Sequence, residues 1–145
     1  MHGRASASNA YGKMANTETD PLQQIVMLYD GAIKFLRLAA ADIELGRMVE
    51  KAEHSNRVLD IIGYLQSILD FENGGEVALI LDSFYSRLTL QILKASATLD
   101  TISMNHAAES LLPVRDAWVN SVSANRSTLA VSKQPSQTGS YQCIA

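Results

Sequence analysis

The sequence predicts an all-α protein: an antiparallel four-helix bundle with a short N-terminal segment and a disordered C-terminal tail. Three observations predict it. No proline lies between Pro21 and Pro113, the five glycines in that stretch leave only a few places that invite a break, and apolar residues recur there at helical spacing. With 145 residues, the chain fits one domain with a sizeable core.

The two ends differ from the middle in composition. Residues 1–19 are small and polar around a single aromatic residue, Tyr11, and residues 127–145 are rich in Ser, Thr, Gln and Pro. Neither end offers enough apolar area to offset the entropy that it would lose on ordering. We therefore expect a flexible segment at 1–19, the helical bundle at 20–125 and a disordered tail at 126–145.

The first predicted helix runs from Pro21 to Gly46. Asp20 can cap its first turn, proline is favoured at the first helical position, and Gly46 is suited to the helix end. Asp30-Gly31 is a turn signal, but apolar residues continue through it in steps of three and four, which favours a helix over a hairpin. The apolar positions are Leu22, Ile25, Tyr29, Ala32, Leu36, Ala39 and Ile43.

The next two helices are expected to form a hairpin. One is drawn from Met48 to Phe71 and the other from about Glu76 to Leu99, with Asn73-Gly74-Gly75 as the stop and connection between them. The expected core residues are Met48, Ala52, Leu59, Ile62 and Leu69 on the first of these and Val77, Leu81, Phe84, Leu88, Ala95 and Leu99 on the second.

The last predicted helix runs from about Ser103 to Ala124 and contains Pro113. Proline has no backbone N–H and clashes with the carbonyl of the residue four positions earlier, here Glu109, so we expect a kink or a short break. The expected core residues are Met104, Ala108, Leu111, Trp118 and Val122.

Composition argues against several classes of function. The chain has 12 basic and 15 acidic residues, so it lacks the excess positive charge of nucleic-acid-binding proteins. No apolar signal region opens the sequence, and no apolar run approaches the roughly 18 residues that span a bilayer. We expect a cytosolic protein without membrane insertion, in which the single Cys143 has no disulfide partner within the chain.

No catalytic, metal or cofactor site can be assembled from the sequence. A di-metal bundle needs two Glu-x-x-His pairs, whereas only the reversed order His106-Ala-Ala-Glu109 occurs, once. His54 could serve a phosphotransfer bundle, but Glu50 and Glu53 make its surroundings acidic, so a solvated surface histidine is the favoured interpretation. We therefore predict that the protein is not an enzyme and binds no cofactor.

The predicted helices carry more apolar residues than one seam per helix requires. Leu28, Phe35 and Leu38 lie beside the first seam, and Gly31 shares their face, where a missing side chain lets another backbone approach. The further surplus residues are Val58, Ile61, Leu65 and Ile68 on the second helix and Leu79, Leu90 and Leu93 on the third. This surplus fits either a compact bundle with two seams per helix or a binding groove.

Three stretches carry a resemblance to a known family: DPLQQIVMLYDGAIKFL, AEHSNRVLDIIGYLQSILDFENGGEVA and the pair Ala117-Trp118. They resemble the FliS family of flagellar secretion chaperones, and the resemblance covers roughly residues 9–125. Its most specific parts are the run from Leu28 to Ile33 and Gly74-Gly75-Glu76. Pro113 and the long tail after Ala124 depart from the pattern of the family.

The resemblance implies an antiparallel helical bundle in the bacterial cytosol that binds the disordered C-terminal segment of flagellin. Such a protein prevents premature polymerisation and delivers its client to the flagellar type III export apparatus. A segment bearing Tyr11 is implied to pack near the groove and to shift when the client arrives. The expected client-binding residues are Tyr11, Leu28, Gly31, Phe35, Val58, Ile61, Leu65, Ile68, Leu90 and Leu93.

Some alternatives stay open. A flagellar regulator is a further candidate partner, and the sequence leaves open whether the chain forms a homodimer. The alternative functions are a structural homo-oligomeric bundle without a client and a histidine phosphotransfer domain that uses His54.

Overall fold

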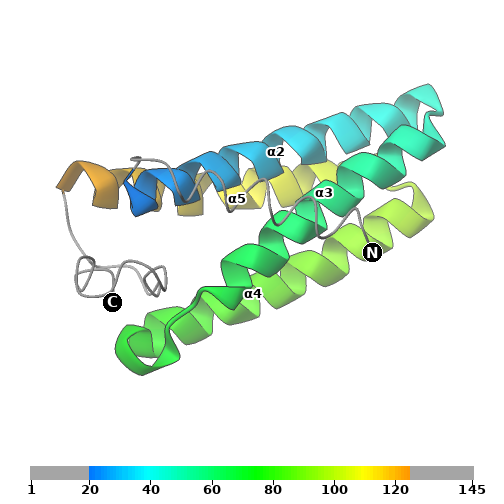
Figure 1. The fold of residues 1–145 in the computed structure, drawn as a ribbon. Coiled ribbons are helices and arrows are strands. Elements are labelled where there is room, and N and C mark those ends of the chain that lie inside the picture. Colours follow the sequence, from blue (N-terminus) through cyan, green and yellow to red (C-terminus); the bar gives the residue numbers. More distant parts are fainter. Residues whose placement is uncertain (1–19, 125–145) are drawn as a thin grey trace.

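The computed structural model describes residues 20–124, which form four helices (Figure 1). Helix α2 spans Pro21–Leu45, α3 spans Met48–Ser67, α4 spans Phe71–Thr98 and α5 spans Thr101–Ala124. The connections at residues 46–47, 68–70 and 99–100 are so short that consecutive helices must lie antiparallel. The predicted all-α four-helix bundle is confirmed.

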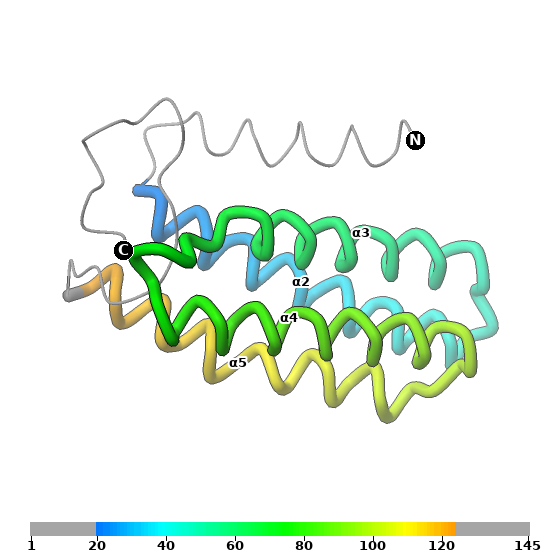
Figure 2. The backbone as a smooth tube through the Cα atoms, turned by 90° about the horizontal axis from the view of Figure 1, so that it is seen from below, coloured from blue at the N-terminus to red at the C-terminus, as the bar shows by residue number. Residues whose placement is uncertain are grey.

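The helices form a closed ring in which each packs against two others. Helix α2 packs on α3 and α5, and α4 packs on the same two helices. Figure 2 shows α4 lying between α3 and α5. The start of α2, the end of α5 and the α3–α4 connection share one end of the bundle, at the left of Figure 1. The core therefore lies along the long axis, and each helix keeps an outward face.

The predicted ends of α2 are confirmed. The Asp20 carboxylate accepts a hydrogen bond from the backbone N–H of Leu22 at 2.7 Å, and Pro21 occupies the first helical position. Gly46 adopts a left-handed conformation with φ of 73°, and its N–H points to the carbonyls of Asp42 and Ile43. A glycine is suited to this position because other residues are strained at positive φ.

The boundary between α3 and α4 differs from the prediction. Helix α3 ends at Ser67, and Asp70 caps α4 by accepting the backbone N–H of Asn73 at 3.1 Å. Asn73-Gly74-Gly75 is therefore not the end of α3, as was predicted, because this cap starts a helical turn before the glycines; the break at Gly75 does agree with a helix that begins at about Glu76. The backbone leaves helical geometry at Gly75 (φ 53°, ψ −127°), and Glu76 follows that break.

Helix α5 continues through Pro113. The sequence predicted either a kink or a short break at Pro113. The break is wrong, because the helix is continuous there, and the kink stays a prediction. Proline has no backbone N–H to donate to the carbonyl of Glu109. Because Pro113 and Glu109 are both exposed, water can donate to that carbonyl instead. This placement lowers the cost of an interior proline.

The predicted core of the two central helices is confirmed only in part: Ile62, Leu69, Leu81, Leu88 and Ala95 are buried as expected. Met48, Ala52, Val77 and Leu99, expected inside, are exposed. The buried residues are Ser55, Val58, Ile61, Ile62 and Leu65 on α3 and Ala78, Leu81, Tyr85, Leu88, Ile92 and Ala95 on α4. Two neighbouring apolar stripes are available on each helix, and the packing of the other helices selects the one that is buried.

Candidate protein-binding surface

The outward face of α4 carries an uncharged row of exposed residues. Its spacing of four, three, four, three and four places all of its members on one side of a helix. We call it the α4 outer stripe: Leu79, Ser83, Ser86, Leu90, Leu93 and Ala97. Its leucines are 59%, 68% and 49% exposed in chain order. Exposed leucines repeated along one helix face are typical of a binding surface rather than of scattered surface residues.

Polar contacts on either side hold α4 so that this stripe faces outward. On the α3 side, the amide of Gln66 donates to a carboxylate oxygen of Asp82 at 2.8 Å and to the hydroxyl of Ser86 at 3.0 Å. On the α5 side, the amide of Gln91 donates to the carbonyl of Ser103 at 3.0 Å. The outer stripe therefore lies on a helix that hydrogen bonds join to its neighbours on both sides.

Only two of the residues predicted to bind a client lie on this stripe, Leu90 and Leu93. The sequence also marked Leu79 as surplus, and it is exposed as expected. Ser83, Ser86 and Ala97 were missed because small residues carry no hydrophobic signal. Their alternation with the leucines at helical spacing is the signal that could have revealed them.

Four of the predicted client-binding residues lie in the bundle core instead: Leu28, Val58, Ile61 and Leu65. None is more than 4% exposed, so the expectation that they form an open face is wrong for this structure. The sequence shows that these residues are apolar, but it does not show which of two stripes the neighbouring helices cover. Their contact with a client stays a prediction, and it would require the client to enter the core.

Gly31 lies within α2 and faces α3. A Cβ added to it would lie 3.6 Å from the Cδ1 atom of Ile61, which is an ordinary van der Waals distance. Within residues 20–124, no backbone of another helix approaches close enough to require glycine at this position. The group that lies near Gly31 is therefore the side chain of Ile61, and not the backbone that was expected.

Phe35 is half-buried between α2 and α3, where it stacks on His54 with ring centroids 5.8 Å apart. The guanidinium of Arg57 lies 5.5 Å from the centroid of the same ring. The Nδ1 atom of His54 lies 2.6 Å from the buried carboxylate of Asp42. His54 is thus a partner in a contact between helices, not the solvated histidine that was expected, and the Asp42 carboxylate blocks Nδ1 as a phosphate acceptor.

The two remaining predicted residues are Ile68 and Tyr11. Ile68 is the C-cap residue directly after α3, in the connection to α4, and is partly buried against the core. Tyr11 lies outside the described residues, as do the predicted flexible segment and tail. The implied role of the Tyr11 segment stays a prediction.

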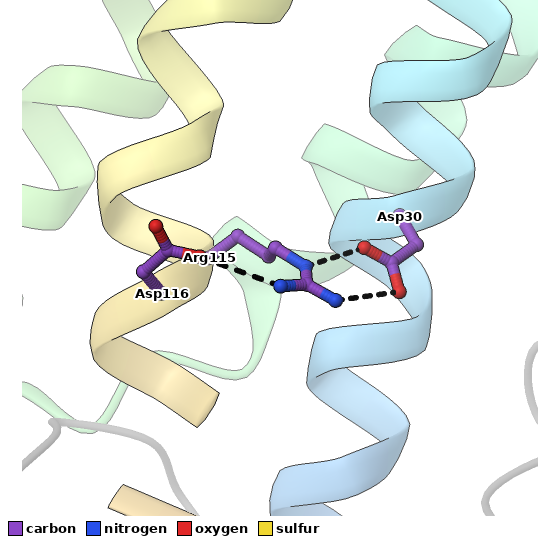
Figure 3. Close-up of polar contacts among 3 residues, drawn as sticks. All are labelled: Asp30, Arg115 and Asp116. Carbon is purple, nitrogen blue, oxygen red and sulfur yellow. Dashed lines mark hydrogen bonds and ion pairs between the residues drawn. The ribbon is translucent and has the colours of Figure 1, made fainter. Parts of the chain in front are cut away.

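An ion pair joins α2 to α5 on the surface (Figure 3). The guanidinium of Arg115 contacts both carboxylate oxygens of Asp30, at 2.6 and 3.4 Å, and also reaches Asp116 at 3.3 Å. The hydrogen bond from Arg115 to Asp30 raises the pKa of that guanidinium. Asp30, part of the turn signal Asp30-Gly31 in the sequence, therefore lies within a helix and binds Arg115 on the surface. An exposed ion pair of this kind adds little stability.

Residues 20–124 place no group of three or more His, Cys, Asp or Glu side chains where it could hold a metal ion. None of the helices described here has the length and apolar character that crossing a bilayer requires. His106 and Glu109, the reversed ligand pair, are both exposed on α5.

The family model described as "Flagellar protein FliS" matches residues 4–125. The flagellar secretion chaperone FliS of Salmonella typhimurium is 32% identical over 79% of this chain and 88% of its own length. The flagellar secretion chaperone FliS of Vibrio cholerae is 33% identical over 68% of this chain and 72% of its own length. The flagellar secretion chaperone FliSB of Pseudomonas aeruginosa is 29% identical over 70% of this chain and 81% of its own length. This chain belongs to the FliS family of flagellar proteins.

Proposed function

We propose that this protein is a cytosolic flagellar secretion chaperone that binds the C-terminal segment of flagellin. It prevents premature polymerisation and hands its client to the flagellar type III export apparatus. It acts by binding rather than by catalysis and uses no cofactor. Membership of the FliS family supports the chaperone role, and the α4 outer stripe is the observation that supports a binding surface.

The α4 outer stripe suits a client that docks along a helix. Three exposed leucines offer apolar area, and the small residues between them leave room for the side chains of the client. Because the leucines are already exposed, docking here needs no opening of the bundle. The client loses conformational entropy as it orders, which keeps the affinity moderate and permits release at the export apparatus.

Calorimetry with a peptide of the flagellin C-terminal segment tests this proposal. Leu90→Asp places a carboxylate in the middle of the stripe and should weaken binding at least about tenfold, because a charge at an apolar contact loses its hydration. Ile102→Asp is the matched control, since Ile102 is 70% exposed on a different helix. This control should bind like the wild type, and both variants should keep the thermal melt of the wild type.

Three results would contradict the proposal in different ways. If the wild type does not bind the peptide, the chaperone role itself fails. If Leu90→Asp binds normally, the client docks elsewhere. If Ile61→Asp stays folded, then Ile61 is not the core residue that its complete burial indicates, and the buried face again becomes a candidate.

The Tyr11 segment can be tested with the same peptide. If it covers part of the client surface, deletion of residues 1–19 should leave the affinity unchanged or raise it, because a competing internal segment lowers the apparent affinity. A weaker complex after the deletion would instead mean that the segment contributes contacts to the client.

A further inference from the structure

The first turn of α4 contains the pair Asn73-Gly74. Asparagine followed by glycine is especially prone to deamidation, because the glycine nitrogen can attack the asparagine side chain with no second side chain in the way. Within residues 20–124 the other asparagines lie inside helices and precede a larger residue: Asn56, Asn105 and Asn120. We propose that Asn73 is a site of spontaneous deamidation and that the cap formed by Asp70 sets its rate.

Three hydrogen bonds to Asp70 hold this pair in helical geometry. The backbone N–H of Asn73 donates to Oδ1 of Asp70 at 3.1 Å, and its side-chain amide donates to Oδ2 at 2.9 Å. The backbone N–H of Gly74 donates to the carbonyl of Asp70 at 2.8 Å. The attacking nitrogen and the departing amide nitrogen are thus both bound by one residue, and the reaction requires this turn to open.

The turn can open without the rest of α4. Gly75 leaves helical geometry directly after the pair, and the first buried residue of the helix is Ala78. Phe71 and Asn73 are exposed, so the turn is held by the Asp70 cap rather than by core packing. Opening a segment with few buried contacts costs far less free energy than unfolding the whole protein.

The chemistry needs only water and hydroxide. In the open turn, hydroxide removes the proton of the Gly74 N–H, and this nitrogen forms a bond to Cγ of Asn73. The Cγ–Nδ2 bond then breaks, and ammonia leaves with a proton from water, which restores the hydroxide. Water opens the resulting succinimide ring either at Cγ, which yields aspartate, or at the backbone carbonyl carbon, which yields isoaspartate.

Neither product can restore the cap. An aspartate at this position lacks the amide N–H that donates to Oδ2 of Asp70, and it brings a second carboxylate to that oxygen. Two carboxylates at such a distance repel one another when both are ionised. An isoaspartate lengthens the backbone, which disturbs the spacing of helical hydrogen bonds. Deamidation should therefore leave the first turn of α4 open.

Peptide mass spectrometry of the full chain, incubated at mildly alkaline pH, tests the proposal. Asp70→Ala removes two of the three hydrogen bonds and should speed deamidation of Asn73 at least about tenfold. Asp100→Ala is the matched control, because the Asp100 carboxylate caps α5 in the same way, accepting the backbone N–H of Ser103 at 2.9 Å. This control should leave the rate at Asn73 unchanged.

Two further samples bracket these rates. A free peptide of residues 68–78 has no folded cap and should react at least about tenfold faster than the wild-type chain. Gly74→Ala places a methyl group beside the attacking nitrogen and should slow the reaction. Labelling by isoaspartyl methyltransferase with S-adenosylmethionine identifies the isoaspartate product, and circular dichroism establishes that each variant is folded.

The consequence for the cap has its own test. Hydrogen exchange at Gly74 should be faster in Asn73→Asp than in Asn73→Ala, since both lose the amide donor but only the first adds a charge beside Asp70. Equal exchange in these two variants would overturn the repulsion between carboxylates. Equal deamidation in the wild type and Asp70→Ala would overturn control by the cap. An Asn73 that stays intact in Asp70→Ala while the peptide reacts would overturn the site itself.

Discussion

The hydroxyl oxygens of Tyr29 and Tyr85 lie 2.6 Å apart inside the bundle and join α2 to the diagonally opposite helix α4. Both side chains are buried, with no more than 1% of their surface exposed. The ring of Tyr29 is also tilted against that of Trp118 on α5, with centroids 6.4 Å apart. These aromatic residues therefore connect three helices around one buried hydrogen bond.

Removing both hydroxyls should cost less than the sum of the costs of removing each one alone. Tyr29→Phe or Tyr85→Phe leaves a buried hydroxyl unpaired and should lower the free energy of unfolding by about 1 to 3 kcal/mol. The double variant leaves neither hydroxyl unpaired and should be destabilised by less than the sum of the two single changes. Urea unfolding followed by the fluorescence of Trp118 measures all four proteins, and additive effects would show that the hydroxyls are not coupled.

The same pair should make the protein sensitive to alkali. Burial raises the pKa of Tyr29 to about 12 and raises that of Tyr85 well above its ordinary value of 10.0. Below pH 10 both phenols are neutral in the folded and unfolded chains, so the stability is fully present. As the pH rises from 10 toward 12, the unfolded chain loses these protons first, and stability is lost.

For Tyr29 alone this loss amounts to about 2 to 3 kcal/mol at pH 12, from a pKa difference of roughly two units. Urea titrations at about pH 8 and about pH 11 should show the decline in the wild type. The double phenylalanine variant should lose much less stability over the same range. An equal decline in both proteins would mean that other groups cause it.

The fold followed from the sequence, but the burial of individual residues did not. The cap at Asp20, the stop at Gly46 and the helical spacing between them depend on local chemistry, and the structure agrees with each. The core partner Tyr85 was missed because its burial depends on Tyr29, 56 positions away in the sequence. A tyrosine hydroxyl is buried only where it has a hydrogen-bond partner, and the sequence of one helix does not identify that partner.

The candidate surface was predictable only in part for the same reason. Leu90 and Leu93 were named as surplus residues, and they are exposed. Ile61 and Leu65 gave an equal apolar signal, but α2 and α4 pack against the helix that carries them. Which stripe remains open is decided by tertiary packing, and the spacing within one helix contains no information about it.

Gly31 should be replaceable by alanine at no cost to the fold. The added methyl group would contact Ile61 at an ordinary distance, and alanine is the better helix former, so stability should rise by about 0.5 to 1 kcal/mol. Gly46→Ala is the matched control. It should lower stability, because φ of 73° strains any side chain even though no atom of the described residues lies within 4 Å of the added Cβ. Thermal melts of both variants measure this contrast, and a destabilised Gly31→Ala would mean that α2 and α3 approach more closely than described.

Pro113 should limit the stability of α5. It leaves the carbonyl of Glu109 without its helical donor, so Pro113→Ala should restore a hydrogen bond and raise the free energy of unfolding, by up to about 3 kcal/mol. Pro21→Ala is the matched control, since the N–H that proline lacks at a first helical position has no partner within the helix in any case. That variant should be neutral or slightly destabilised.

Hydrogen exchange adds a local test, because amides near Glu109 should exchange faster than those of α2 in the wild type and slow down in Pro113→Ala. Equal stability of the two variants, together with uniform protection along α5 in the wild type, would show that the helix accommodates Pro113 without loss.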